Sequence, residues 1–226
     1  MNSFQAAIFD LDGLLIDSEP LWEEAEINVF ARLGVKITSQ MCQKVKGFRV
    51  DETIRFFCQC TSFDALDPDL IEQQIISEVK RSIYEKARGL PGCVYILHFF
   101  QSRDIPLALA SASPYDIIDL ALRKLSIHQH FKIIYSATEE KYGKPHPGIF
   151  FTTAEQLQVE PQNCIVFEDA LNGIIAAKAA RMKAVAVPAD QTSMDLRFVL
   201  ADLILPSLLQ FKEDHLEYLI NPHHGG

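Results

Sequence analysis

Two aspartates separated by one residue follow an apolar segment near the start of the chain. The segment reads AAIFD and ends in Asp10; Leu11, Asp12 and Gly13 follow it. Side chains two positions apart on a strand point the same way, so Asp10 and Asp12 can face one pocket. Gly13 allows a sharp turn, because glycine adopts backbone angles that other residues avoid. Carboxylates at the mouth of an apolar strand therefore indicate a site that uses their charge.

Three interpretations of this pair imply different chemistry. Capping of the next helix explains Asp10 poorly, because Asp17 and Ser18 lie closer to that helix. A calcium loop counted from Asp10 would need glycine and glutamate where the chain has Leu15 and Leu21. The third is a catalytic pair, in which a hard cation such as Mg²⁺ relieves the repulsion between the carboxylates. Such a site suits phosphoryl transfer, with one carboxylate attacking phosphorus and the other moving a proton.

Three further motifs follow at the ends of other predicted strands. LALASASP contains Ser111 and opens a helix, so its hydroxyl and backbone N–H groups can hold a phosphate. GKPHP presents Lys144 in a turn fixed by proline, and IVFEDA ends in Glu168 and Asp169, which suit a metal. Each motif alone is weak evidence. Their order, with each at a strand end, indicates one site.

Short apolar segments predict buried strands, because their hydrophobicity is nearly continuous rather than alternating. These segments are Ala6–Asp10, Pro106–Ser111, Lys132–Ala137, Cys164–Glu168, Ala184–Pro188 and Leu203–Leu205. Helical patterns lie between several of them, at Val94–Gln101, Tyr115–Leu125, Pro147–Leu157 and Leu171–Ala180. The alternation predicts an α/β fold with a parallel sheet. Ligands of such sheets bind beyond the carboxyl ends of the strands, where the motifs lie.

The stretch from residue 17 to residue 87 breaks this alternation and has helical patterns throughout. Ser18 is a plausible N-cap for its first helix. Trp22 fits the apolar stripe of that helix, which is more typical of a core position than of a cleft. We therefore expect an α/β core made of residues 1–16 and 88–226, with residues 17–87 as a helical insert.

Composition excludes several classes of protein. The chain has 226 residues, of which 48% are hydrophobic and 23% charged. Its formal net charge is −9 and it has no basic stripe, so a nucleic-acid partner is not expected. It has no apolar run of about 18 residues, so no membrane partner is expected. The first ten residues lack a basic region, which predicts a cytoplasmic protein. A monomer is the default expectation. The cysteines are predicted to be reduced, packed thiols: Cys42, Cys58, Cys60, Cys93 and Cys164.

The motifs DLDGLLIDSEP, SASP, KPHP and EDALNGI, in this order, resemble the haloacid dehalogenase superfamily of phosphatases. The likeness covers nearly the whole chain and is strongest to the branch with a small cap inserted after the first strand. It implies a Rossmann-like parallel sheet core with an inserted α-helical cap domain. It also implies Mg²⁺ as cofactor, Asp10 as the nucleophile that forms an aspartyl-phosphate, and Asp12 as the general acid and then the base.

The same resemblance implies how the phosphoryl group and the metal are held. Ser111, the Ala112 backbone N–H and Lys144 would hold the transferring phosphoryl group, and a lysine and a metal together offset its charge. The metal ligands that it implies are Asp10, the backbone carbonyl of Asp12, Asp169 and, directly or through a neighbour, Glu168.

The segment KGFRVDE in the insert is the candidate specificity loop. In relatives the cap closes over the site, excludes water and carries specificity residues. Lys46, Gly47 and Arg49 could then reach the substrate. An ion pair of Arg49 with Asp51 or Glu52 is an equally weighted alternative.

Two departures from the β-phosphoglucomutase pattern favour hydrolysis. Mutases of this branch have a histidine shortly after the motif glutamate, whereas Glu19 is followed by Pro-Leu-Trp. They also have lysine and asparagine after the second serine of SAS, whereas Ser113 is followed by Pro-Tyr. GLLIDSEPLWEEAE, GFR and LASASP look like bacterial 2-deoxyglucose-6-phosphatases and hexitol phosphatases, which implies a hexose or hexitol phosphate as substrate. A β-phosphoglucomutase-like isomerase and a non-catalytic regulatory protein are the alternatives.

Overall fold

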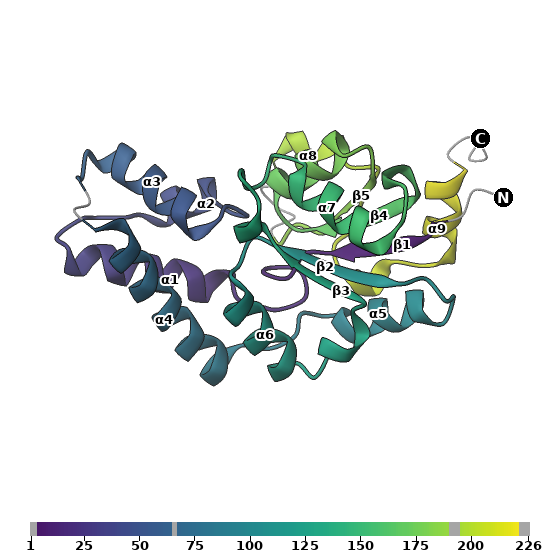
Figure 1. Ribbon diagram of the computed structural model, residues 1–226, viewed down its shortest axis with the longest axis horizontal. Coiled ribbons are helices and arrows are strands. Elements are labelled where there is room, and N and C mark those ends of the chain that lie inside the picture. The colour runs from purple at the N-terminus through teal and green to yellow at the C-terminus, as the bar shows by residue number, and fades with distance from the viewer. Residues whose placement is uncertain (1–3, 65–66, 190–194, 222–226) are drawn as a thin grey trace.

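The computed structural model describes residues 4–64, 67–189 and 195–221. Within these residues a parallel sheet has the strand order β3-β2-β1-β4-β5-β6 (Figure 1). Its strands are β1 (Ala6–Phe9), β2 (Leu107–Ser111), β3 (Ile133–Ser136), β4 (Cys164–Glu168), β5 (Lys183–Ala186) and β6 (Leu203–Ile204). Each predicted strand is present, with ends displaced by at most two residues, as is usual for boundaries.

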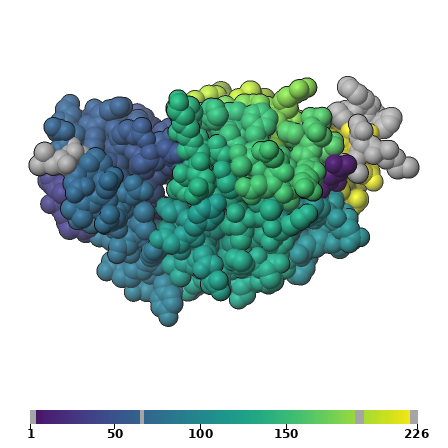
Figure 2. Space-filling view, in the orientation of Figure 1, coloured from purple at the N-terminus to yellow at the C-terminus, as the bar shows by residue number. Residues whose placement is uncertain are grey.

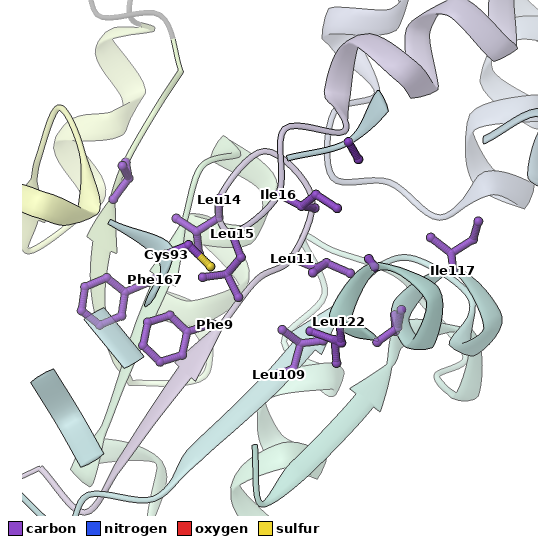
Figure 3. Close-up of a cluster of buried hydrophobic side chains, with 14 of the residues drawn as sticks. Phe9, Leu11, Leu14, Leu15, Ile16, Cys93, Leu109, Ile117, Leu122 and Phe167 are labelled. Carbon is purple, nitrogen blue, oxygen red and sulfur yellow. The ribbon is translucent and has the colours of Figure 1, made fainter. Parts of the chain in front are cut away.

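Helices cover both faces of this sheet, which explains why its strands are apolar on both sides. On one face lie α5 (Cys93–Gln101), α6 (Tyr115–Lys124) and α9 (Glu213–Ile220); on the other lie α7 (Gly148–Leu157) and α8 (Leu171–Ala179). Residues one position apart on β1 belong to different cores: Phe9 to the first and Ile8 to the second. Figure 3 shows Phe9 beside Phe167 of β4, and their rings stack with centroids 4.9 Å apart.

Among the described residues, four helices follow β1 and form the helical insert, which lies at one end of the molecule (Figure 1). They are α1 (Glu19–Arg32), α2 (Ser39–Lys44), α3 (Val50–Thr61) and α4 (Pro68–Lys86). Their apolar sides pack together, with Phe30 of α1 meeting Phe57 of α3 edge to face at 5.4 Å. In Figure 2 the insert stands as a purple and blue lobe beside the green and teal surface of the sheet region.

The chain leaves the sheet for the insert and returns from it at neighbouring positions. The Asp17 N–H donates to the carbonyl of Arg88 at 2.9 Å, and the Leu90 N–H donates to the carbonyl of Leu15 at 3.0 Å. These bonds hold the outgoing and returning segments side by side. The insert therefore joins the rest of the chain through two adjacent connections.

Ser18 corrects one sequence expectation. It occupies the N-cap position of α1, but its hydroxyl makes no capping hydrogen bond. The hydroxyl donates to Oδ1 of Asp12 at 2.6 Å. A capping hydroxyl would accept from a backbone N–H of the first turn, but Ser18 has φ of −112° and ψ of −16° instead of the extended backbone typical of capping residues. None of the helices in the described part of the chain is long and apolar enough to span a membrane.

Short 3₁₀ turns complete the connections. They are η1 (His128–His130), η2 (Ala137–Glu139), η3 (Pro161–Asn163), η4 (Leu196–Leu200) and η5 (Leu208–Gln210).

Candidate active site

A cavity of about 850 Å³ opens where the carboxyl ends of β1, β2 and β4 face the helical insert. The central strand β1 pairs with β2 on one side and β4 on the other, so the connection reverses direction across it. Open α/β sheets bind ligands at such a switch point. Asp10, Asp12, Ala112, Ser113 and Asp169 line the cavity from the sheet side.

Lys144 is the buried cation that connects two of the strand ends. Its ammonium donates to Oδ1 of Asp10 at 2.7 Å, to Oε1 of Glu168 at 2.5 Å and to the carbonyl of Ala110 at 3.0 Å. The residue is 2% exposed. Burial by itself lowers the pKa of Lys144, but the two carboxylates outweigh it and raise the pKa above its ordinary value. The lysine therefore stays charged at neutral pH.

Three buried carboxylates meet at this point. Asp10, Glu168 and Asp169 each offer an oxygen within 4.8 Å of the others. Burial raises the pKa of Asp10 to about 6, with Lys144 opposing the shift and Asp169 adding to it. Burial and the Asp10 charge raise the pKa of Glu168 to about 8, and burial also raises the pKa of Asp169. With all three carboxylates ionised, the cluster would hold more negative charge than Lys144 balances, and a further cation would relieve that repulsion.

The cluster fits a divalent cation. Oε2 of Glu168 is buried and has no hydrogen-bond partner among the described residues. A cation from the insert, the Lys46 ammonium, lies 2.6 Å from Oδ2 of Asp169. Burial lowers the pKa of Lys46, but Asp169 and neighbouring acids raise it to about 12. An oxygen-only donor set with unbalanced charge is typical of Mg²⁺ sites, so Asp10, Glu168 and Asp169 are suited to hold this ion.

Two glycines make room for these carboxylates. Gly13 has φ of +72°, and a Cβ there would lie 2.2 Å from Oδ2 of Asp169. A Cβ at Gly173 on α8 would lie 2.0 Å from the carboxyl carbon of Glu168. Both distances are far below van der Waals contact, so a side chain at either position would displace an acid of the cluster.

Asp12 is held apart from the cluster by hydrogen bonds. Its Oδ1 accepts from the Ser18 hydroxyl at 2.6 Å and from Nε1 of Trp22 at 2.9 Å. Its Oδ2 accepts from the Ser113 hydroxyl at 2.7 Å and, more weakly, from the Ser111 hydroxyl at 3.4 Å. The carboxylate therefore has donors on both oxygens and a fixed orientation beside the cavity.

The sequence-predicted residues of the sheet region all come together at this cavity. Ser111 lies behind the wall, where its hydroxyl accepts from the Ser113 N–H at 3.0 Å, and Ala112 lines the wall itself. From the insert, Lys46 and Gly47 also line the cavity. Of the predicted residues, the cavity is lined by Asp10, Asp12, Lys46, Gly47, Ala112 and Asp169, and the residues buried behind its wall are Ser111, Lys144 and Glu168.

Arg49 lies elsewhere, because other groups occupy its guanidinium. Nε and Nη2 donate to the carboxylate of Asp51 at 3.0 and 2.9 Å. Nη1 donates to the carbonyls of Glu140 at 2.6 Å and Ala137 at 3.3 Å, in the segment before Lys144. The alternative ion pair with Asp51 is confirmed. Arg49 is not among the described residues that line the cavity, and its reach to the substrate stays a prediction.

Sequence reasoning missed the donors to Asp12. Ser113 stands out in the sequence only through the Pro-Tyr pair after it, Ser18 fits a helix cap, and Trp22 fits the core. Ser18 and Trp22 are four residues apart, a spacing that places two side chains on one side of a helix. Because Asp12 lies just before that helix, this spacing was the signal in the sequence that Ser18 and Trp22 could both bind Asp12.

Comparison with known proteins identifies the family. Residues 7–187 match the haloacid dehalogenase-like hydrolases. The chain belongs to this family. The family and the α/β fold expected from the motifs are thereby confirmed.

Several relatives are named as phosphatases. The chain is 37% identical over 206 residues to hexitol phosphatase B of Escherichia coli strain K12, covering 91% of this chain and 93% of that protein. It is 33% identical over 177 residues to a phosphorylated carbohydrates phosphatase of Thermotoga maritima, covering 78% and 81%. Among solved structures, a β-phosphoglucomutase from Clostridium difficile is similar with a TM-score of 0.85 and 28% identity, covering 97% and 98%.

Proposed function

We propose that this haloacid dehalogenase-like hydrolase is a Mg²⁺-dependent phosphatase of hexose or hexitol phosphates that works through an aspartyl-phosphate. The proposal rests on one observation: the two aspartates have different surroundings, which suit them to different roles. Asp10 is buried against Lys144, whereas Asp12 is held by neutral donors at the cavity wall. In this proposal residues 17–87 are the cap, over a core of residues 1–16 and 88–226.

The first step transfers the phosphoryl group to Asp10. Lys144 binds Oδ1 of Asp10, so Oδ2 is the oxygen that attacks phosphorus while the bond to the sugar oxygen breaks. Attack requires the carboxylate, and a pKa of about 6 leaves Asp10 mostly ionised at neutral pH. Asp12 gives its proton to the departing sugar oxygen, which leaves as an alcohol.

The second step restores the enzyme. Asp12, now ionised, takes a proton from water, the resulting hydroxide attacks phosphorus, and the bond from phosphorus to Asp10 breaks. Inorganic phosphate leaves, and Asp12 again holds a proton. Throughout, the backbone N–H of Ala112 binds a phosphoryl oxygen, and the charge of Lys144, whose three N–H groups are donated to Asp10, Glu168 and Ala110, offsets phosphoryl charge from behind Asp10. Mg²⁺, when held by Asp10, Glu168 and Asp169, would supply positive charge next to the phosphoryl group.

The cavity favours a substrate with a single phosphate. Lys46 is the only cation among the described residues that line it, and Asp169 already pairs with it. The insert contributes several carboxylates to the wall, including Asp17, Glu23 and Glu24. Carboxylates can accept hydrogen bonds from the hydroxyls of a polyol, but they repel a second anionic group. The relatives named for hexitol and carbohydrate phosphates support the same class.

This charge pattern disfavours the isomerase alternative. A mutase that works through a bisphosphate must bind a second phosphate at the far end of the cavity, where the insert is acidic. The structural similarity to a β-phosphoglucomutase keeps that alternative worth testing.

The test is phosphate release, with and without Mg²⁺, from 2-deoxyglucose 6-phosphate, hexitol phosphates, glucose 6-phosphate, β-glucose 1-phosphate and phosphoglycolate. We expect Mg²⁺-dependent release that favours the hexose and hexitol esters and is lost in Asp10→Asn. Conversion of β-glucose 1-phosphate to the 6-phosphate without phosphate release would identify a mutase instead. Absence of both reactions would leave the regulatory alternative.

A further inference from the structure

Trp22 is the only tryptophan in the chain, and it contacts the candidate acid rather than the apolar core alone. It lies in the first turn of α1, and its ring is partly buried against the apolar cluster of the insert and sheet. Its Nε1 donates to Oδ1 of Asp12 at 2.9 Å, and the residue lines the cavity. One side chain thus connects the insert to Asp12.

The chemistry of the indole distinguishes it from the other donors to Asp12. A hydroxyl such as that of Ser18 or Ser113 can rotate and act as donor or acceptor, whereas an indole N–H can only donate. Oδ1 of Asp12 is therefore kept as an acceptor. The proton that Asp12 gives and takes is directed to Oδ2, where the Ser113 hydroxyl lies at 2.7 Å and can reverse its role.

We propose that Trp22 is a positioning residue that orients Asp12 for both proton transfers, so that the insert takes part in the chemistry through one hydrogen bond. The proposal rests on the proposed function, because it assumes that Asp12 is the acid and base. Lys144 donates its three N–H groups to Asp10, Glu168 and Ala110 and none to Trp22, so loss of the indole N–H leaves the hydrogen bonds of the buried lysine unchanged.

The kinetic test uses Trp22→Phe, which keeps an aromatic ring but removes the N–H donor. Misplacing a general acid–base group costs about 10 to 100-fold in turnover, so kcat on the preferred sugar phosphate should fall by that factor. KM should change by less than about 3-fold, because phosphate binding is intact. Phe56→Leu, which alters another partly buried aromatic of the insert, is the matched control and should leave both constants unchanged.

A chromogenic ester separates positioning from general damage to the site. The nitrophenolate of p-nitrophenyl phosphate leaves without a proton, so formation of the aspartyl-phosphate does not need Asp12 as acid. Water attack in the second step still needs Asp12 as base. In Trp22→Phe the burst of nitrophenolate should therefore keep its rate while the steady-state rate falls. Equal slowing of both phases would show a merely structural role and overturn the proposal.

Fluorescence tests the contact without any turnover. Because Trp22 is the single tryptophan, the emission of the wild-type protein reports on its surroundings alone. Asp12→Ala should change the intensity or wavelength of that emission, whereas Asp51→Asn, a loss of charge elsewhere on the insert, should not. Identical spectra for the wild type and Asp12→Ala would overturn the contact.

The outcomes separate the two proposals. An active wild type with an equally active Trp22→Phe refutes the role of Trp22 and leaves the phosphatase intact. A wild type that releases phosphate from no ester refutes the proposed function, and the role of Trp22 falls with it.

Discussion

Gly173 shows how a missing side chain determines the position of a carboxylate. Alanine normally stabilises a helix by up to about 1 kcal/mol relative to glycine. At this position its Cβ would lie 2.0 Å from the carboxyl carbon of Glu168, which is fixed by Lys144. We expect Gly173→Ala to lower the free energy of unfolding by about 1–3 kcal/mol, measured by urea denaturation, and to weaken activity strongly.

A second variant tests the cause of that loss. In a Glu168→Ala background the carboxylate is gone, so Gly173→Ala should no longer destabilise the protein. Equal costs in both backgrounds would mean that α8 resists the methyl group for another reason. A stabilising Gly173→Ala would contradict the geometry directly.

The sequence predicted the site residues that belong to a motif. It predicted poorly the residues whose role depends only on a contact in the folded structure. Asp10 and Asp169 were found because charge at the end of an apolar strand is costly and therefore visible in the sequence, and Lys144 was found from its place between a glycine and a proline-fixed turn. The hydrogen bond of Trp22 was not visible, because an aromatic ring on an apolar stripe reads as core whether or not its N–H has a partner. For Arg49 the sequence left a substrate contact and an ion pair equally weighted, and it gave no sign of the bond to the Glu140 carbonyl, because no local pattern encodes a contact between distant segments.

At the scale of elements, the N-terminus of α3 joins the insert to the segment that carries Lys144. Arg49 binds the carbonyls of Ala137 and Glu140, and Glu52 on the same helix accepts from the Gly143 N–H at 3.0 Å. These contacts hold the insert against the segment immediately before the lysine. If Arg49 holds the insert in place, its loss should affect all substrates alike, whereas loss of a substrate contact should affect only the substrates that it binds.

We expect Arg49→Met to lower kcat/KM by about 10-fold, because hydrogen bonds to a charged group contribute about 1.5–3 kcal/mol. The factor should be the same for a sugar phosphate and for p-nitrophenyl phosphate. Arg55→Met is the matched control, since Arg55 also pairs with Asp51 but is exposed, and it should have little effect. A loss confined to the sugar phosphate would restore Arg49 as a substrate contact.

The packing of α1 against α2 predicts a pH-dependent stability of the insert. Burial raises the pKa of Glu26 on α1 from 4.5 to about 8, although a hydrogen bond with Cys42 of α2 opposes the shift. The folded protein thus holds a proton that the unfolded chain releases. This contribution to stability is complete below about pH 4.5 and is lost progressively as the pH rises toward about 8.

Glu26→Gln removes this titration. The melting temperature of Glu26→Gln minus that of the wild type should therefore increase from about pH 5 to about pH 8 and then level off. Ile27→Val changes the neighbouring side chain without altering a titrating group. The melting temperature of Ile27→Val minus that of the wild type should therefore stay constant with pH. A constant difference for Glu26→Gln as well would show that Glu26 ionises normally in the folded protein.

For the molecule as a whole, the hydrophobic pattern predicted where strands and helices lie along the chain. It did not predict which strands pair with each other in the sheet. Parallel strands buried on both faces look alike in sequence, so nothing in β2 or β4 alone states that each pairs with β1. The resemblance implied a Rossmann-like parallel sheet, which the structure has, but the order of its strands comes from the structure alone. How the insert lies over the sheet depends on contacts between distant segments, such as Lys46 with Asp169, which no local pattern encodes.

The charge of the whole molecule predicts how its stability responds to metal removal. The chain carries a formal net charge of −9, and its buried acids repel one another at the strand ends. A ligand that binds only the folded state stabilises it by about 2.7 kcal/mol at a hundred times its Kd. Mg²⁺ should therefore raise the melting temperature, chelation should reverse the rise, and sodium chloride at equal ionic strength should produce much less of it.

Asp169→Asn should lose most of the Mg²⁺ response, whereas Asp51→Asn, on the insert, should keep it. An equal rise in Asp169→Asn would place the stabilising ion elsewhere on the acidic surface and would remove the strand-end acids as the metal site.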